Sequence, residues 1–379
     1  MRWLKLALHY CVLAVKLFLS STVPPWRLRR IQASGMFDPA FYRKAHPLLH
    51  PVHLRFPLRH YLTQGERSGL QPSPLFSPRA YLRHNSEIGL ESFEGALWHY
   101  ISKGRAQRLV CVDPVPDAAA YGPLAGAPCA PADIAVVVHV FYPKLWAEIE
   151  ARLHKLQIGF DLYVTVTETA EHAAQLITEI RSAWPRAYVV AMPNRGRDVL
   201  PFTQLVNGGL LSQYQAVCKL HTKASTHLRD GAGWRNALLE GVLPSEDAPA
   251  MLRSFLSDPH AALLVPEGHA YDGPGHWGAN RARVEALIKR LRPGQMPARF
   301  SFPAGTVCWI KAPVIAQLVA LALQVEEFEP EWGQTDGTLA HGVERLLGVL
   351  AADLGLSVAT PSALARASSP AFSASETVA

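Results

Sequence analysis

The chain has 379 residues, of which 49% are hydrophobic and 18% charged, and its formal net charge is +6. This length allows two or three domains with sizeable cores, and the composition excludes disorder over most of the chain. The five cysteines are scattered without a C-x-x-C pair, which argues against a disulfide framework or a cysteine zinc site and favours a reducing compartment. We find no nucleic-acid-binding signature, so the positive charge better suits phosphate-bearing or membrane-surface partners than nucleic acid.

The first 30 residues are predicted to form an amphipathic helix followed by a basic stretch. Residues 3–20 are apolar apart from Lys5, His9 and Lys16, which fall within roughly 40° of one another on a helix. Two lysines disfavour a central membrane span, and Lys16 inside the apolar run disfavours a signal peptide. With the arginines at 27–30, the helix is expected either to lie on the inner face of the cell membrane or to pack against the protein. The first alternative predicts a cytoplasmic, peripheral membrane protein.

Residues 31–109 contain a tandem repeat. FDPAFY at 37–42 matches FSPRAY at 76–81, and HYLTQGERSG at 60–69 matches HYISKGRAQR at 99–108, with one offset of 39 residues. A shared offset across several anchor residues indicates duplication. Each unit is expected to form two short helices that begin at the caps Asp38 and Ser77 and end near Gly65 and Gly104. We interpret His60 and His99 as structural, and the repeat as a packing or partner-binding region.

The remainder reads as a linker, an α/β domain and a tail. The Pro-, Ala- and Gly-rich residues 110–132 are the expected linker, and the Ala/Ser/Pro-rich residues 361–379 are expected to be disordered. Between them, the domain at 133–360 alternates strands with helices, which predicts a mainly parallel sheet with right-handed crossovers. The expected strands are 134–140, 161–167, 188–192, 216–220, 261–265 and 307–311. The expected helices are 143–156, 170–182, 199–211, 234–243, 247–257, 281–292, 313–323 and 336–350.

A charged cluster, NRGRD at 194–198, follows the strand at 188–192. In open parallel sheets, ligands bind at the carboxyl ends of the strands. Arginine guanidinium groups suit bidentate phosphate binding, and Gly196 would let a ligand approach the backbone. Asp198 has a second interpretation, as the N-cap of the following helix. We predict that the cluster contacts a ligand.

A second cluster, HTK at 221–223, follows what should be a central strand. His221 and Lys223 side by side at a strand tip can neutralise a diphosphate without a metal ion. The alternative interpretation is an exposed loop lysine. The position at a strand end favours the functional interpretation.

The predicted helix after Gln334 carries a third set of charged residues. Asp336 stands at its expected start, where the helix dipole favours the ionised form, so Asp336 is either a base beside a cleft or a simple N-cap. His341 and Arg345 share one face of this helix, and Glu344 can pair with either.

Several known site motifs are absent from the sequence. There is no G-x-x-x-x-G-K-[ST], no G-x-S-x-G and no H-E-x-x-H, and no G-x-G-x-x-G follows the first strand. These absences argue against a P-loop enzyme, an α/β-hydrolase, a zinc protease of this type and a dinucleotide dehydrogenase.

Seven segments together resemble the rhamnan synthesis protein F family, whose members help to build rhamnose-containing cell-surface polysaccharides and lipopolysaccharide O-antigens. They are HVFYPKLW (139–146), FDLYVTVT (160–167), PNRGRDVLPF (193–202), YQAVCKLHTKAS (214–225), GWR (233–235), FPAGTVCW (302–309) and TDGTLAHGVERLLG (335–348). The tandem units also resemble those that precede glycosyltransferase domains in such proteins.

The layout further resembles a GT-A glycosyltransferase, in which an Asp-x-Asp metal motif ends the central strand. Here HTK stands in that place, and a cationic tip would hold Mg²⁺ or Mn²⁺ poorly, so a divalent metal is possible but not favoured and no cofactor is expected. The resemblance implies inverting transfer of a deoxysugar, with rhamnose expected, from a nucleotide-sugar donor such as dTDP-rhamnose to a glycan or lipid-linked acceptor.

On this reading, Asp336 acts as the base, and His221 and Lys223 stabilise the leaving diphosphate. The other predicted substrate-binding residues are His139, Tyr142, Glu168, Asn194, Arg195, Arg197, Asp198, Trp234, Arg235, His341, Glu344 and Arg345. Two alternatives stay open: a catalytically inactive glycan-binding or scaffold protein of the same pathway, and, more weakly, an anion-handling enzyme that uses the same basic cleft.

Overall fold

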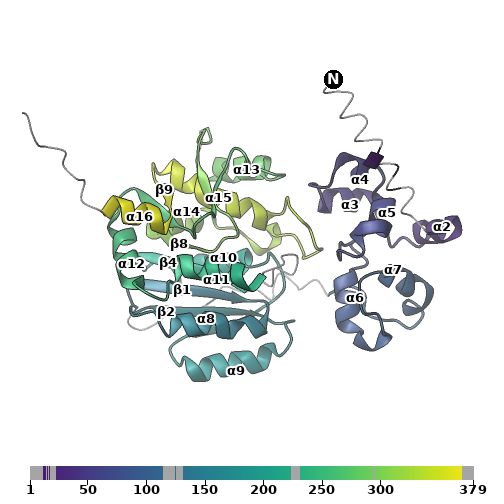
Figure 1. Cartoon of the computed structure of the whole chain (residues 1–379), viewed down its shortest axis with the longest axis horizontal. Helices are drawn as coiled ribbons and strands as arrows, with labels where there is room; N and C mark the ends of the chain where they lie inside the picture. Colours follow the sequence, from purple (N-terminus) through teal and green to yellow (C-terminus); the bar gives the residue numbers. More distant parts are fainter. Residues whose placement is uncertain are drawn as a thin grey trace, which may run out of the picture. The chain divides into compact units, whose positions relative to one another are not determined.

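The computed structural model describes residues 12, 13, 15, 17, 23–113, 124, 131–222, 231–292 and 295–368. The chain divides into two compact units (Figure 1). The repeat unit comprises Met1–Val115 and Pro330–Thr338, and the sheet unit comprises Pro116–Glu329 and Leu339–Ala379. Most of the predicted N-terminal helix, most of the linker, Lys223 and the tail from 369 lie outside the described residues.

The repeat unit consists of short helices. The helix α2 (Pro25–Ala33) precedes the two repeats. The first repeat then forms α3 (Pro39–Ala45), α4 (Pro51–Arg55), α5 (Pro57–His60) and the π-helical turn η1 (Tyr61–Gly65). The second forms α6 (Pro78–His84), the 3₁₀ turn η2 (Ser86–Ile88), α7 (Ala96–His99) and the π-helical turn η3 (Tyr100–Gly104). The predicted N-caps are present: the Asp38 carboxylate accepts the Ala40 N–H at 2.8 Å, and the Ser77 hydroxyl accepts the Ala80 N–H at 3.3 Å.

The two repeats share their internal contacts as well as their letters. Tyr42 Oη lies 3.0 Å from His60 Nδ1, and at the same offset Tyr81 Oη lies 2.7 Å from His99 Nδ1. Burial lowers the pKa of His60 to about 4, with smaller contributions from neighbouring histidines, so its imidazole is neutral at physiological pH. Both histidines therefore serve as hydrogen-bonded packing residues.

Gly65 and Gly104 are required for a reason other than the one predicted. Neither has a positive φ, so neither is a left-handed cap. A Cβ atom on Gly65 would lie 2.2 Å from Tyr42 Oη, and one on Gly104 would lie 2.3 Å from Tyr81 Oη. The close approach of each tyrosine to the backbone excludes any side chain at these positions.

The sheet unit is built on a seven-stranded sheet of order β3-β2-β1-β4-β8-β5-β9. All neighbouring strands pair in parallel except β8, which runs antiparallel to both β4 and β5. The strands are β1 (Ile134–Val140), β2 (Asp161–Thr167), β3 (Tyr188–Met192), β4 (Ala216–His221), β5 (Ala261–Leu264), β8 (Cys308–Lys311) and β9 (Ser357–Ala359). A separate hairpin pairs β6 (Ala270–Asp272) with β7 (Ser301–Pro303). The predicted α/β class, a mainly parallel sheet flanked by helices, is confirmed.

Helices cover both faces of the sheet, so the central strands are buried on both sides (Figure 1). One face packs against α10 (Val199–Asn207), α13 (Arg281–Leu291), α14 (Ala312–Leu321) and α15 (Leu339–Asp353). The other packs against α8 (Trp146–Leu153), α9 (Ala173–Ala183), α11 (Gly231–Val242), α12 (Ala248–Ser257) and α16 (Pro361–Ser368). Strands buried on both faces read as continuous apolar runs, which is why the sequence located them well.

Other features also differ from the predictions. The helix expected at 336–350 begins at Leu339, so Asp336 precedes the helix instead of starting it. Residues 361–368, expected to be disordered, form α16, and its Leu364 is buried against the sheet core. The hairpin of β6 and β7 and the edge strand β9 were not predicted, because strands of three residues are too short to leave a periodic pattern.

Candidate functional site

Five polar side chains lie on one face of the central sheet, near the carboxyl ends of three strands. Successive strand residues point to opposite faces, so His139 on β1, Thr165 and Thr167 on β2, and Lys219 and His221 on β4 share the face covered by α10, α14 and α15. Strand pairing aligns them, because His139 lies opposite both Thr165 and His221. We call these five residues the polar band. It lies toward the carboxyl ends of the parallel strands, where α/β sheets bind ligands.

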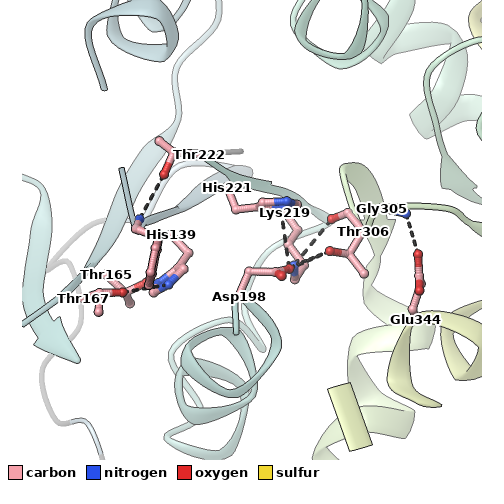
Figure 2. Close-up of polar contacts among 11 residues, drawn as sticks. His139, Thr165, Thr167, Asp198, Lys219, His221, Thr222, Gly305, Thr306 and Glu344 are labelled. Atoms are coloured by element: carbon pink, nitrogen blue, oxygen red, sulfur yellow. Dashed lines mark hydrogen bonds and ion pairs between the residues drawn. The ribbon is translucent and has the colours of Figure 1, made fainter. Parts of the chain in front are cut away.

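Asp198 contacts the polar band from the start of α10 (Figure 2). Its carboxylate forms an ion pair with the Lys219 ammonium, accepts a hydrogen bond from Thr306 Oγ1 at 2.6 Å, and lies 3.6 Å from His221 Nδ1. Asp198 occupies the N-cap position of α10, as one interpretation predicted, but its side chain makes no capping hydrogen bond to that helix. The carboxylate instead joins β4 to the turn that precedes β8.

The electrostatics of this cluster keep Asp198 ionised. Burial raises the pKa of its carboxyl, but the charges of His221 and Lys219 and the hydrogen bonds from Lys219 and Thr306 outweigh burial and hold the pKa well below its ordinary value. Lys219 is only 2% exposed, and its ammonium also donates to Thr306 Oγ1 at 3.0 Å. The negative charge of Asp198 is therefore balanced inside the protein.

His139 is enclosed between two threonines. Its Nδ1 lies 2.9 Å from Thr165 Oγ1 and its Nε2 lies 3.2 Å from Thr167 Oγ1 (Figure 2). Burial, more than any nearby charge, lowers the pKa of His139 to about 3, so the ring is neutral. Both ring nitrogens are already engaged, so the contact with a nucleotide predicted for His139 stays a prediction that this arrangement does not favour.

Thr222 fixes the loop after β1. Its Oγ1 accepts the N–H groups of Phe141 and Tyr142, both at 2.9 Å, and its own N–H donates to His139 O at 3.0 Å. The Tyr142 side chain, predicted to face the nucleotide, is exposed beside this anchor. Lys223, the next residue, lies outside the described residues.

The predicted phosphate-binding loop at 194–198 is hydrogen-bonded to a segment far along the chain. Arg195 Nε donates to Phe328 O at 2.8 Å, so this guanidinium is partly used within the protein. Arg197 is exposed and has a φ of +55°, and Asn194 is half-buried. Glu168, at the end of the neighbouring strand β2, has an exposed side chain, and its N–H donates to Met192 O at 2.8 Å.

Arg235 and Trp234 lie on α11. Arg235 pairs with both carboxylate oxygens of Glu148 at 3.1 and 3.2 Å, and the Trp234 ring lies 5.9 Å from the His269 ring. A cavity of about 20 Å³, enough for about one water molecule, lies at the tip of β4. Its lining consists of Leu145, Glu148, Ile149, His221, Thr222, Arg235, Leu238, Leu239 and Val307.

Glu344 and Arg345 on α15 support the cluster from behind. Glu344 Oε1 accepts the Gly305 N–H at 2.5 Å, which holds the turn that carries Thr306 (Figure 2). Arg345 pairs with Glu344 Oε2 at 2.5 Å and donates to His341 O at 3.1 Å. These contacts act within the protein, so the predicted ligand contacts of His341, Glu344 and Arg345 remain untested.

Sequence reasoning missed Lys219 and Thr306. Lys219 sits inside a run that was interpreted as an apolar strand, and a lysine in a doubly covered strand requires a buried counter-charge. That signal was available. The role of Thr306 could not be inferred from the sequence, because its partner Asp198 lies more than a hundred residues away along the chain.

Residues 124–356 match the family described as rhamnan synthesis protein F, which is more than half of the chain. The chain belongs to the rhamnan synthesis protein F family. The family match includes the whole polar band, Asp198, Thr306 and Asp336.

Two curated relatives match part of the chain. The chain is 32% identical over 232 residues to proteins described as uncharacterized protein WxcX from two strains of Xanthomonas campestris pv. campestris. The match covers 61% of this chain and 33% of each relative, so the chain spans about a third of their length.

A solved structure is also similar at a low level. The mannosyltransferase PcManGT from Pyrobaculum calidifontis, in complex with GDP-Man and Mn²⁺, is 13% identical, with 59% of this chain and 53% of that chain covered. The TM-score is 0.29.

Asp336, the predicted base of this family member, lies in the segment 330–338 of the repeat unit. Its side chain is buried, with 3% of the residue exposed. Its predicted catalytic role stays a prediction.

Neither a metal-binding cluster nor a membrane-spanning helix is present among the described residues. Within the described ranges, no group of three or more His, Cys, Asp or Glu side chains is arranged to hold a metal ion. Over the same part of the chain, every helix is too short or too polar to span a bilayer. A roomier cavity of about 550 Å³ lies in the sheet unit beside the hairpin of β6 and β7, and no residue of the polar band lines it.

Proposed function

We propose that this member of the rhamnan synthesis protein F family is a glycosyltransferase of cell-surface polysaccharide or O-antigen synthesis. It transfers a deoxysugar, rhamnose, from a nucleoside diphosphate donor such as dTDP-rhamnose to a glycan or lipid-linked acceptor. One observation carries this proposal: within the family match, the carboxyl-terminal part of β4 and the loop after β3 carry a charged network centred on Asp198, Lys219 and His221.

The leaving diphosphate is the group that this network serves. Transfer of the sugar leaves negative charge on the diphosphate, and donors fixed in advance stabilise that charge better than mobile water does. His221, whose side chain is 10% exposed, ends β4, and Arg197 is exposed on the neighbouring loop. Lys223 adds a third cation close in sequence to His221. Asp198 and Lys219 are positioning residues, because their charges are paired with each other.

Proton removal is assigned to Asp336. A carboxylate can accept the proton of the acceptor hydroxyl as that oxygen attacks the sugar carbon, and a single displacement inverts the configuration at that carbon. Asp336→Asn is expected to abolish transfer and to leave donor binding within twofold of the wild type. Unchanged turnover in this variant would remove Asp336 from the mechanism.

The proposed reaction does not require a divalent metal. The strand tip that resembles the place of an Asp-x-Asp motif carries histidine, threonine and lysine, and Mg²⁺ prefers oxygen ligands. The nearby carboxylate, Asp198, is committed to Lys219 and Thr306. Cations of the protein would then supply the charge that a metal supplies elsewhere.

We place the protein at the cytoplasmic face of the membrane, near a lipid-linked acceptor. The helix α2 supports this, because it presents Trp26, which is 59% exposed, beside the exposed Arg29 and Arg30. Tryptophan and arginine are the side chains favoured at an anionic lipid surface.

A donor screen tests the proposal. The full-length chain is incubated with dTDP-rhamnose and with UDP- and GDP-sugars, with and without a chelator, and with a polysaccharide acceptor from a rhamnose-containing glycan. Release of dTDP and growth of the glycan in chelator are the expected results. Release that depends strictly on added Mn²⁺ or Mg²⁺ would contradict the metal-free mechanism.

The alternative is a catalytically inactive glycan-binding or scaffold protein of the same pathway. The ion pair between Asp198 and Lys219 favours this alternative, because it leaves the carboxylate unavailable to a metal ion. A transferase that had lost its metal site would keep the fold and lose the transfer activity. The same screen separates the two functions, since glycan binding without release of any nucleoside diphosphate would support the scaffold.

A further inference from the structure

The segment Pro330–Thr338 belongs to the repeat unit, although the residues on both sides of it belong to the sheet unit. The chain leaves the sheet unit after Glu329 and returns to it at Leu339. We call residues 330–338 the bridging segment. It contains Asp336, so the repeat unit holds the one carboxylate that the proposed mechanism uses as a base.

The bridging segment packs on helix α3 of the first repeat. The Thr335 N–H donates to Ala45 O at 3.0 Å, and the ring of Trp332 meets the ring of Phe41 edge to face, with centroids 5.4 Å apart and an interplanar angle of 66°. An edge-to-face pair of this kind is an attractive arrangement of aromatic rings. Two contacts, one polar and one aromatic, therefore hold the segment to α3.

The segment is also bonded within itself. Gln334 Nε2 donates to Pro330 O at 2.8 Å, and Gln334 Oε1 accepts the Trp332 N–H at 2.9 Å. Asp336 and Thr338 are both buried. The segment is thus a folded loop, and its conformation is set by its contacts as well as by its two ends.

The two ends are held together in the sheet unit. Glu329 Oε2 accepts the N–H of Leu339, the first residue of α15, at 2.8 Å, and Glu329 Oε1 pairs with Arg283 at 2.6 Å. A carboxylate at a helix start satisfies a backbone N–H and suits the helix dipole. This hydrogen bond holds the two ends of the bridging segment close together.

The first repeat differs from the second at the contacting positions. The equivalent of Phe41 in the second repeat is Ala80, and the equivalent of Ala45 is His84. The aromatic side chain that contacts Trp332 is therefore specific to the first repeat. The common contacts of the repeats, such as Tyr42 with His60, do not require it.

We propose that the first repeat orders the bridging segment and thereby positions Asp336, with Phe41 as the positioning residue and Trp332 as its partner. This inference rests on the proposed function, in which Asp336 removes the proton of the acceptor.

The test compares Phe41→Ala with Leu48→Ala in the full-length chain. Alanine already occupies the position equivalent to Phe41 in the second repeat, so the fold is expected to persist. Leu48 is a surface control in the same unit, with 63% of the residue exposed. In Phe41→Ala, hydrogen exchange of amides in 330–338 should accelerate at least about fivefold, while exchange in β1 stays unchanged. Leu48→Ala should change neither.

The kinetic readout tests the link to Asp336. Phe41→Ala should lower kcat at least about fivefold and change the donor KM by less than about twofold, because donor binding does not use the segment. Trp332→Ala should match Phe41→Ala, and Trp332→Phe, which keeps an aromatic ring, should restore most of the wild-type exchange and kcat.

Each outcome decides one part of the inference. Unchanged exchange at 330–338 in Phe41→Ala would overturn the ordering role of the first repeat. Faster exchange with an unchanged kcat would overturn the positioning of Asp336. A wild-type chain without transferase activity would overturn the proposed function, and the exchange data would still decide whether the repeat orders the segment.

Discussion

The carboxylate of Asp198 contacts the ammonium of Lys219 in the interior of the sheet unit. The lysine comes from the middle of β4 and the aspartate from the loop after β3, so the pair joins one loop that was predicted to bind a ligand to the strand that leads into the other. The Lys219 side chain is 2% exposed and the Asp198 side chain 14%. Charges so shielded from water are tolerated only when they are paired, and this pairing is the reason that both residues are present.

Replacing one partner of this ion pair should destabilise the protein more than replacing both. Asp198→Asn leaves a buried ammonium without a counter-charge, which is expected to cost about 3–5 kcal/mol. The double variant Asp198→Asn with Lys219→Met should recover most of that loss. Urea unfolding of the wild type, both single variants and the double variant measures the coupling. Additive losses in the double variant would show that the two groups do not depend on each other.

The neutral state of His139 predicts a loss of stability in mild acid. Its pKa in the folded protein is about 3, against an ordinary value of 6.5. Between these values the unfolded chain binds a proton that the folded chain excludes, so stability decreases as the pH falls below 6.5, by up to ~1.4 kcal/mol per pH unit.

His139→Gln should reduce this slope, as measured by urea unfolding between about pH 7 and about pH 4.5. His46 and His60, whose pKa values are lowered to about 4, contribute in the same direction, so the difference from wild type isolates His139. The depressed pKa of Asp198 affects stability in a lower pH range. The stabilisation from the ionised Asp198 carboxylate is present above about pH 4 and is lost as the pH falls through its pKa in the folded protein. Equal slopes in wild type and His139→Gln would mean that His139 is protonated in the fold.

Gly196 should be intolerant of alanine. It has a φ of +61°, and a Cβ atom would lie 2.6 Å from both Leu200 Cβ and Phe328 Cδ1. Gly196→Ala is therefore expected to cost about 2–4 kcal/mol, from backbone strain and overpacking together. Gly209→Ala is the matched control, because Gly209 has a φ of +72° with nothing within 4 Å, and it should cost only about 1 kcal/mol. Thermal unfolding of both variants makes the comparison, and similar losses would exclude the steric argument.

The exposed face of α2 should contribute to binding of anionic membranes. Each arginine near such a surface is worth about 1 kcal/mol, so Arg29→Gln with Arg30→Gln should weaken partition onto phosphatidylserine vesicles by about 30-fold at low salt. Arg281→Gln with Lys289→Gln removes the same charge from exposed positions on α13 and serves as control. Equal weakening by both pairs would mean that net charge, and not the α2 face, decides binding.

The sequence was most informative where one segment alone determines the structure. The strands at 134–140, 161–167 and 188–192 were predicted with their observed bounds, because each is a short run dominated by apolar residues. The caps Asp38 and Ser77 were also predicted correctly, since a cap acts on the residues that follow it.

The candidate site was harder to predict, because its contacts join distant parts of the chain. Aspartate is a residue type that commonly caps helices, so the sequence alone suggests that role for Asp198. Only the fold brings Lys219 and Thr306 to its carboxylate. In the same way, Glu344 was recognised as a charged residue near the site, but its bond to the Gly305 N–H depends on how α15 packs. Local patterns cannot reveal such pairs.

The central claim is that the tip of β4 binds the diphosphate of a nucleotide sugar, and calorimetric titration tests it most directly. The full-length chain is titrated with dTDP, UDP and GDP in the presence of chelator, alongside His221→Asn and the control His260→Asn, whose histidine is exposed before β5. We predict that at least one of the three nucleotides binds to the wild type and to the control with equal affinity. The same nucleotide should bind to His221→Asn at least about tenfold more weakly. Binding of the same strength in His221→Asn, or no binding by the wild type, would contradict the account.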